Sequence, residues 1–233
     1  MKKYLLMLLL LLSVTVLTAC NNTKEVTDEE KIEETIDEEK EGIPYPNAMP
    51  TSLKFGINEL TADLSKDELS NEDILNAYLY ADSISMFMNV CTLENVNYED
   101  RIEITNPANG FVMDYYKSND FNTYDDFKNY ISKVFSKEMT EKLLTNESYQ
   151  SYDDMLYILP AGRGTDIFAL DDTYKIVKES DNKISFKVAT GYIDEKSGKE
   201  PNEFADPDYY EYNNFDLEKL DEGWRFTSFP VIR

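Results

Sequence analysis

The sequence predicts an α+β domain in which helices come first and an antiparallel β-meander follows. Apolar residues recur at helical spacing over residues 70–88, whereas they alternate with a period of two over residues 184–192. Further strand-like segments separated by turn signals come after them. Helical and strand patterns that are segregated along the chain are typical of α+β architecture. We expect this domain to span residues 51–233.

A targeting segment is expected before the domain. A basic start, Met1-Lys-Lys, precedes an apolar run over residues 4–17 that is too short to cross a membrane comfortably. The run ends in Leu-Thr-Ala-Cys20, which resembles the bacterial lipobox, a small-residue cleavage site directly before a cysteine. The resemblance implies that residues 1–19 are a lipoprotein signal peptide and that Cys20 is lipidated. The mature chain would then be extracytoplasmic and anchored to the outer face of the cell membrane.

Residues 20–50 are expected to form a spacer. They are rich in Glu, Asp, Lys and Thr, have almost no large apolar side chain, and end in a proline-containing stretch. Such a composition buries too little apolar surface to offset the entropy of ordering, and its like charges keep it extended. We therefore expect a disordered, acidic tether, with a cation-binding acidic face as the alternative.

The charge balance and the lack of histidine exclude several classes of function. The chain has 46 Asp+Glu against 23 Lys+Arg, a formal net charge of −23, and no histidine. Nucleic acid is not an expected partner, because phosphate binding needs a basic surface. Without imidazole there is no Ser-His-Asp or Cys-His catalysis and no His-ligated zinc. Cys91 has no partner once Cys20 is lipidated, so we expect no disulfide framework, no metal and no other cofactor.

A carboxylate pair is the remaining route to an enzyme. The candidates are the pairs Asp171/Asp172 and Asp206/Asp208, which are neighbours in an acidic chain. Solvated turns explain such neighbours, and no spacing matches a calcium-binding EF-hand loop. We therefore do not expect an enzyme.

The first element of the domain is an amphipathic helix that Ser70 caps. Asp73 follows three residues later, which is a weak capping-box pattern. The stripe of this helix comprises Ile74, Tyr78, Ala81, Ser85 and Met88. Its methionine and aromatic content indicates core packing, with a ligand-binding face as the alternative.

A strand pair and two shorter helices follow. Residues 101–105 alternate as a strand, and residues 111–116 are its expected partner across an Asn-Pro-Ala-Asn-Gly turn. Thr123 or Asn122 opens the next helix, whose acidic first turn suits the positive end of the helix dipole. Ser136 caps a further short helix.

A strand-like run over residues 155–159 leads into the loop on which the functional interpretation depends. The loop comprises Pro160, Ala161, Gly162, Arg163, Gly164, Thr165 and Asp166. Proline ends a strand ladder because it has no N–H, and glycines relieve the backbone where φ is positive or where another chain comes close. A second apolar run follows over residues 167–170. Local chemistry leaves two interpretations open: a tight turn between two strands, or a recognition loop on a rigid scaffold.

Four strands complete the predicted meander. They cover residues 173–178, 184–192, 209–217 and 224–229. In the second strand an apolar set alternates with a set that comprises Lys183, Ser185, Lys187 and Ala189. We expect the apolar face to be buried and the other face to be exposed to solvent. Gly223 begins the last strand and Pro230 ends it.

Three segments, in this order and spacing, are similar to a known family. They are YDDFKNYISKVFS at residues 124–136, LYILPAGRG at residues 156–164 and WRFTSFP at residues 224–230. Together they resemble the IseA-type DL-endopeptidase inhibitors of Gram-positive bacteria over residues 72–233. The resemblance implies an α+β, cystatin-like or two-lobed fold. It also implies an inhibitor of NlpC-type cysteine endopeptidases, which cut the D-γ-glutamyl–diamino-acid bond of peptidoglycan peptides.

The resemblance further implies that a loop between the two lobes, residues 160–166 here, enters the active-site cleft of a cell-wall cysteine endopeptidase. We expect the inhibitor to be a monomer. Three features depart from the family. Arg163 stands in a loop that is acidic elsewhere, the cysteine pair of some members is missing because Cys91 has no partner, and Cys20 anchors a protein that other members simply secrete.

A ligand-binding lipoprotein with an NTF2-like or cystatin-like cup is the alternative, and it would recognise a wall fragment or a peptide. Its site would be lined by tyrosines, namely Tyr115, Tyr116, Tyr157, Tyr209, Tyr210 and Tyr212. Half-buried packing within strands is the more ordinary role of tyrosine.

Overall fold

The computed structural model describes residues 42–50, 58–89, 95–106, 110–160, 162, 164, 166–200 and 205–231. The expected signal peptide, Cys20 and Cys91 lie outside these residues. The chain divides into two units, Met1–Glu39 and Lys40–Arg233, and every described residue belongs to the second. No helix in the described ranges is long and apolar enough to cross a membrane.

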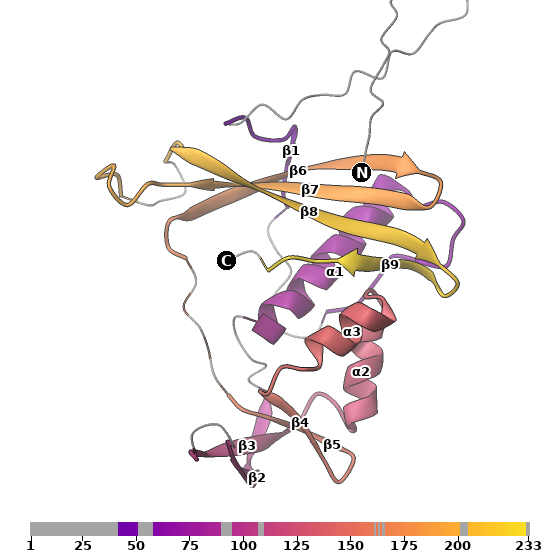
Figure 1. Cartoon of the computed structure of the whole chain (residues 1–233), viewed down its shortest axis with the longest axis vertical. Helices are drawn as coiled ribbons and strands as arrows, with labels where there is room; N and C mark the ends of the chain where they lie inside the picture. Colours follow the sequence, from indigo (N-terminus) through magenta and orange to yellow (C-terminus); the bar gives the residue numbers. More distant parts are fainter. Residues whose placement is uncertain are drawn as a thin grey trace, which may run out of the picture. The chain divides into compact units, whose positions relative to one another are not determined.

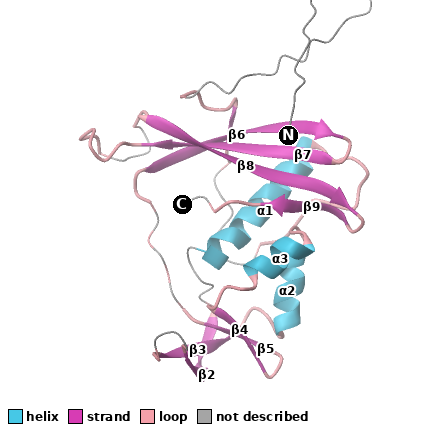
Figure 2. Cartoon of the chain, viewed as in Figure 1, coloured by secondary structure: helices cyan, strands magenta, loops and turns pink. Residues whose placement is uncertain are grey.

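The second unit has the predicted α+β architecture, with three helices and two antiparallel sheets among its described residues (Figure 1, Figure 2). The strand order is β1-β6-β7-β8-β9 in the larger sheet and β2-β3-β5-β4 in the smaller one. The helices lie between the sheets, and one cluster of buried side chains includes residues from both sheets and all three helices. The predicted meander is therefore confirmed for the larger sheet, while the earlier strands form a sheet of their own.

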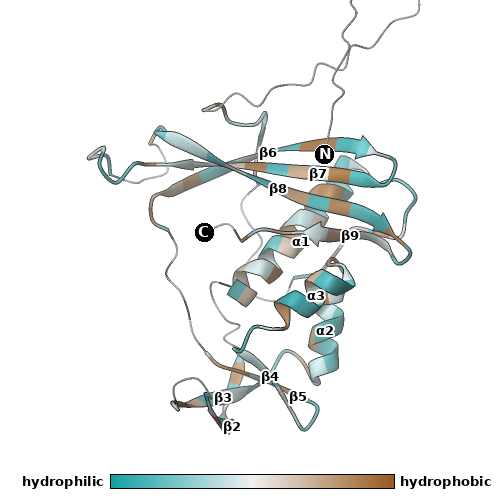
Figure 3. Cartoon of the chain, in the orientation of Figure 1, coloured by the Kyte–Doolittle hydropathy of each residue, from teal (hydrophilic) through white to brown (hydrophobic). Residues whose placement is uncertain are grey.

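Most of the larger sheet is the meander. Its long strands are β6 (Ala169–Ser180), β7 (Lys183–Tyr192), β8 (Tyr209–Leu220) and β9 (Gly223–Ser228). Each neighbouring pair is antiparallel. Figure 3 shows hydrophobic stretches in the middle of these strands and hydrophilic residues at their turns, so the core lies under the centre of the sheet.

The central strand β7 differs from the prediction, because the face expected to contact solvent is largely buried. Ser185 and Ala189, expected to be wet, are fully buried. Ser185 Oγ lies 2.5 Å from Glu179 Oε1 and 3.3 Å from Asp216 Oδ1. The charges of Asp216 and then Glu179 raise the pKa of the Lys183 ammonium, which contacts both carboxylates. Charged side chains of β6 and β8 thus cover the outer face of the strand between them.

Helix α1 (Asn71–Asn89) packs on the inner face of the larger sheet. Its N-terminus is the predicted reciprocal capping box: Asp73 N donates to Ser70 Oγ at 3.1 Å, and Ser70 N donates to Asp73 Oδ2 at 3.2 Å. Tyr78 stacks on Phe186 with ring centroids 4.1 Å apart and meets Phe215 edge-on at 5.1 Å. The predicted stripe is therefore part of the core.

The smaller sheet has four strands, β2 (Val96–Thr105), β3 (Val112–Ser118), β4 (Tyr149–Tyr152) and β5 (Met155–Ile158). Strands β4 and β5 form a hairpin that the sequence does not predict. The chain turns between β4 and β5 at Asp153 and Asp154, with φ of 46° and 63°, a conformation that aspartate tolerates. Tyr149 joins this sheet to α1, because its hydroxyl donates to Phe87 O at 2.6 Å.

Helices α2 (Tyr124–Ser132) and α3 (Lys137–Leu143) begin where the sequence predicts. Thr123 caps α2 with a capping box, and Ser136 caps α3. The link between the two helices is tied to β9, since Ser136 N donates to Phe226 O at 3.0 Å. The helix pair and the last strand of the larger sheet therefore share a backbone connection.

Residues 42–50, expected as the end of the tether, instead pack on the larger sheet. Strand β1 (Asn47–Ala48) pairs with β6. The Tyr212 hydroxyl accepts hydrogen bonds from Gly42 N and Ile43 N at 3.0 Å. It also donates to Ile43 O at 3.0 Å. The prolines that suggest a spacer also favour the extended backbone of an edge strand, so composition alone does not separate the two.

Candidate functional site

The candidate loop links the two sheets. Strand β5 ends at Ile158 in the smaller sheet, and Leu159 N still donates to Ser148 O at 2.8 Å. Strand β6 begins at Ala169 in the larger sheet (Figure 1). Of the two interpretations left open by the sequence, the tight turn is wrong, because β5 and β6 are not neighbours in one sheet.

Three of the four described residues of the loop are open to solvent, and the fourth, Pro160, is half-buried. Gly162, Gly164 and Asp166 are exposed, and the following Ile167 is 68% exposed. A Cβ added to Gly164 would meet no atom within 4 Å, and its φ is not left-handed. Neither crowding nor strain therefore requires glycine at position 164, and the missing side chain leaves the backbone accessible to another chain. The remaining loop residues, Ala161, Arg163 and Thr165, lie outside the described residues.

Asp166 fixes the end of the loop to the start of β6. Its Oδ1 accepts from Phe168 N at 2.9 Å, in the kind of turn that aspartate side chains commonly close. Phe168 O accepts from Ile193 N at 3.0 Å, just past the end of β7. The end of the loop is thus held against the β7–β8 connection.

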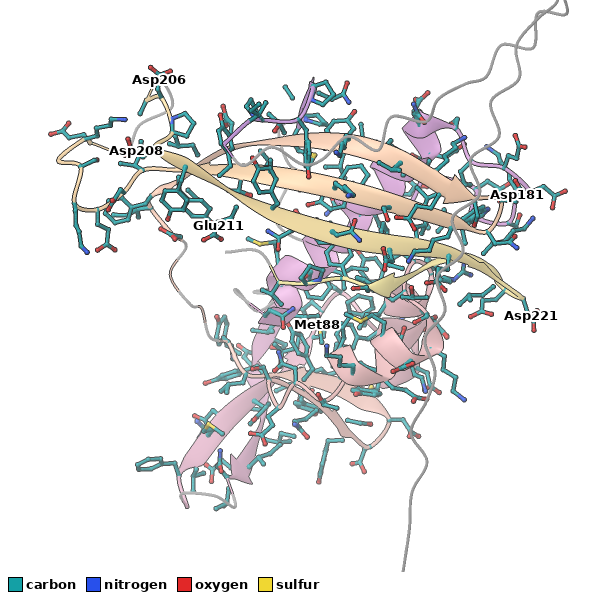
Figure 4. The ribbon with its side chains drawn as sticks, turned by 45° about the horizontal axis from the view of Figure 1, so that its top comes forward. Met88, Asp181, Asp206, Asp208, Glu211 and Asp221 are labelled. Atoms are coloured by element: carbon teal, nitrogen blue, oxygen red, sulfur yellow. The ribbon has the colours of Figure 1, made fainter. Side chains whose placement is uncertain are left out.

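Acidic side chains gather near this end of the loop. Tyr209 stacks on Tyr192 with ring centroids 5.4 Å apart. Partial burial raises the pKa of the Tyr209 hydroxyl, and the charges of Glu211 and Asp166 raise it further. Figure 4 shows Asp206, Asp208 and Glu211 at one end of the larger sheet, and Asp181 and Asp221 at the other.

Part of this negative charge is neutralised locally. Lys199 forms an ion pair with Asp208, and the hydrogen bond from Lys199 lowers the pKa of the Asp208 carboxyl. Asp208 also accepts from Asp194 N at 3.0 Å. Within the described residues, Asp166 and Glu211 have no cationic partner, so these two carboxylates contribute unpaired negative charge beside the loop.

A comparison with models of protein families identifies the family of this chain. The model of the IseA DL-endopeptidase inhibitor family matches residues 65–231, which include all three helices and strands β2 to β9. The chain belongs to the IseA DL-endopeptidase inhibitor family. The resemblance drawn from three sequence segments is therefore confirmed, and a peptidase is the partner that the family implies. A comparison with curated proteins gives no match.

This IseA-family chain also has exposed apolar residues that the sequence analysis missed. Phe111 is 70% exposed and Val112 is 59% exposed, at the start of β3. In the sequence, the one feature that could have indicated this surface is the pair of large apolar residues directly after the turn glycine Gly110. They place an apolar surface on the β2–β3 hairpin of the smaller sheet.

The six tyrosines named for a ligand-binding cup are divided between the two sheets in this member of the IseA family. Three of the six tyrosines lie in the smaller sheet and three in β8 of the larger one. Tyr212 is engaged by residues 42–43. Asp172 accepts from Thr190 Oγ1 at 2.6 Å. The described part of the chain contains no group of three His, Cys, Asp or Glu residues that could hold a metal ion.

Proposed function

We propose that this protein is a cell-surface inhibitor of NlpC-type peptidoglycan DL-endopeptidases and that residues 160–166 enter the active-site cleft of the enzyme. The observation that carries the proposal is an exposed segment that links the two sheets and is held at both ends. Leu159 N is bonded to Ser148 O at 2.8 Å, and Phe168 O is bonded to Ile193 N at 3.0 Å. A loop anchored in this way loses little conformational entropy when it binds.

The chemistry of inhibition needs no catalytic group from the inhibitor. The sequence has no histidine, and its loop offers ordinary α-peptide bonds. The target enzymes are expected to cut a D-γ-glutamyl bond, so an α-peptide chain would fill the cleft without presenting the bond that is broken. Family membership supports this inhibitory role.

The charges beside the loop also support this end of the larger sheet as the surface that contacts the enzyme. A cleft that accepts the carboxylates of wall peptides is expected to have positive potential. Asp166 and Glu211 would meet that potential at the contact, while the net charge of −23 would attract the enzyme from longer range. Lipidation at Cys20, followed by an acidic tether, would hold the inhibitor at the outer face of the membrane where wall enzymes act.

The first experiment tests inhibition and the loop together. The purified chain would begin at Lys40, because this unit contains every described contact. We expect it to inhibit a DL-endopeptidase in a peptidoglycan digestion assay. Gly162→Val together with Gly164→Val should weaken inhibition by about tenfold or more, since bulky branched side chains would crowd the interface. Gly164→Val alone should leave the thermal midpoint unchanged, because position 164 has open space around it.

A matched pair of charge variants tests the contact end. Asp166→Asn with Glu211→Gln removes two negative charges beside the loop, and asparagine can still accept from Phe168 N. Asp181→Asn with Asp221→Asn removes two charges at the other end of the sheet (Figure 4). The first pair should weaken inhibition about tenfold at low salt and less at high salt, and the second pair should have little effect. Equal losses in both pairs would show that only total charge matters.

A further inference from the structure

A second candidate site lies on other elements, between α2, α3 and the β8–β9 hairpin. It is a pocket of about 410 Å³. Lys128 comes from α2, Lys137 and Thr140 from α3, and Arg225 from β9, while Phe135 contributes an apolar wall. The volume falls in the range of small-molecule pockets.

The pocket is basic although the chain as a whole is strongly acidic. Lys128, Lys137 and Arg225 line it, against two carboxylates, Glu141 and Glu222, which leaves one net positive charge. Lys128 has no ion-pair partner among the described residues. Lys137 has only a marginal one, with Nζ 4.0 Å from Glu141 Oε1 on the exposed side of α3. In a chain of net charge −23, a pocket whose lining has a net positive charge is unusual.

Two backbone hydrogen bonds position the Arg225 guanidinium but occupy only some of its N–H donors. Its Nε donates to Ser132 O at 3.2 Å and its Nη1 donates to Trp224 O at 2.7 Å. A guanidinium has five N–H donors, so three remain without an acceptor in the described part of the structure. The two backbone bonds hold the side chain in place while part of the group stays available to a ligand.

Thr140 supplies an independent sign of a missing partner. The residue is 2% exposed and lines the pocket, and its Oγ1 is the buried side-chain atom without a hydrogen-bond partner among the described residues. A threonine inside a helix usually donates its hydroxyl to a carbonyl one turn earlier, but this hydroxyl does not. Leaving a buried hydroxyl unpaired is unfavourable, so a ligand that accepts from it would relieve that cost.

The frame of the pocket is set by backbone contacts between distant segments. Phe226 N donates to Val134 O at 2.8 Å, and Ser136 N donates to Phe226 O at 3.0 Å. Phe135 and Phe226 thus form a parallel bridge that joins the α2–α3 link to β9. The residues that line the pocket are therefore positioned before any ligand arrives, which lowers the entropy lost on binding.

We propose that this pocket binds the carboxylate of a small ligand of the size of an amino acid or a short peptide. Arg225 and the two lysines match the charge of a carboxylate, and the Thr140 hydroxyl donates to it. The single net positive charge of the lining fits one carboxylate better than a phosphate dianion, which the two glutamates would repel. This site shares no residue with the loop at 160–166, so its success or failure is independent of the proposed inhibition.

The test is a titration of the 15N-labelled chain from Lys40 onward, followed by NMR at constant ionic strength. The probes are acetate, alanyl-alanine and inorganic phosphate. We expect alanyl-alanine to shift the amides of Phe135, Thr140 and Arg225 and to bind more tightly than phosphate. Absence of shifts with both carboxylates would overturn the proposal, and tighter binding of phosphate would show that the ligand class is wrong.

Two variants and one control make the assignment specific. Lys128→Gln and Thr140→Val should each weaken alanyl-alanine binding by about fivefold, the usual effect of one hydrogen bond or charge contact. Lys142→Gln, an exposed lysine on α3 outside the pocket, should leave the affinity unchanged. Thr140→Val keeps the shape of the side chain, so the variant should fold and its thermal midpoint should not fall. Unchanged affinity in both pocket variants would contradict the site.

Discussion

At the residue scale, two glycines show how differently the fold uses the same amino acid. Gly223 begins β9 with φ of +101°, and a Cβ placed there would lie 2.4 Å from Leu64 O. That carbonyl accepts from Trp224 N at 2.8 Å, so it cannot easily move. Gly164 has neither constraint. Glycine is therefore structurally required at 223, while at 164 only the approach of another chain would require it.

Alanine substitutions separate the two cases. Gly223→Ala should lower the free energy of unfolding by about 2 kcal/mol or more, because backbone strain and a steric clash add together. Gly164→Ala should change it by less than about 0.5 kcal/mol, as at other open surface positions. Urea unfolding curves of the two variants provide the comparison. Equal stability of the two variants would contradict this account of Gly223.

The Tyr212 hydroxyl gives a second prediction at this scale. Tyr212→Phe removes the acceptor for Gly42 N and Ile43 N and the donor to Ile43 O, while the ring can still pack against Tyr45. The amides of Gly42 and Ile43 should exchange with solvent faster, at a cost of about 1 kcal/mol or less in global stability. Hydrogen exchange measures the effect, with Tyr210→Phe on the same strand as the control. Unchanged protection of both amides would mean that the hydroxyl does not hold the segment.

At the scale of elements, local signals were predictable and long-range ones were not. Ser70, Thr123 and Ser136 each cap a helix as predicted, because a cap depends on residues three positions away. The buried outer face of β7 could not be predicted, since it depends on Glu179 and Asp216 from neighbouring strands. The loop could be located by its proline and glycines, but not the separation of its flanking strands into different sheets.

The contact between α1 and α2 leads to a prediction about alkaline pH. The Tyr80 hydroxyl donates to Tyr130 O at 3.1 Å, and the Tyr130 hydroxyl accepts from Asn58 N at 3.0 Å. Burial raises the pKa of both hydroxyls, so the folded state holds these protons more tightly than the unfolded chain. Their contribution is complete below the unfolded pKa of about 10 and is lost as pH rises above it.

Denaturant unfolding measured between about pH 8 and pH 11 tests this dependence. The free energy of unfolding should fall above about pH 10, and Tyr80→Phe should make that fall less steep. Tyr98→Phe, at a tyrosine that is 64% exposed, is the control. If Tyr80→Phe left the steepness the same as in the parent chain, burial of this hydroxyl would not be the cause.

At the scale of the whole molecule, the functional account depends on one connection. The two sheets share a helical core, and the segment from β5 to β6 crosses between them as a loop in which Gly162, Gly164 and Asp166 are exposed. Glu211 lies beside its end. Membership of the inhibitor family could be recognised from sequence, because three short segments keep their order and spacing. The pocket under Arg225 could not be foreseen, since it forms only when β9 meets α2 and α3.

The most direct test asks whether the loop reaches the active site of the enzyme. In the chain from Lys40, with Cys91→Ser to remove the other thiol, Gly164→Cys would be mixed with an NlpC-type endopeptidase under mild oxidation. The account predicts a disulfide between position 164 and the catalytic cysteine of the enzyme, and none from Asp181→Cys at the far end of the sheet. Inhibition without a disulfide at position 164, or equal disulfide formation from both positions, would contradict insertion of the loop.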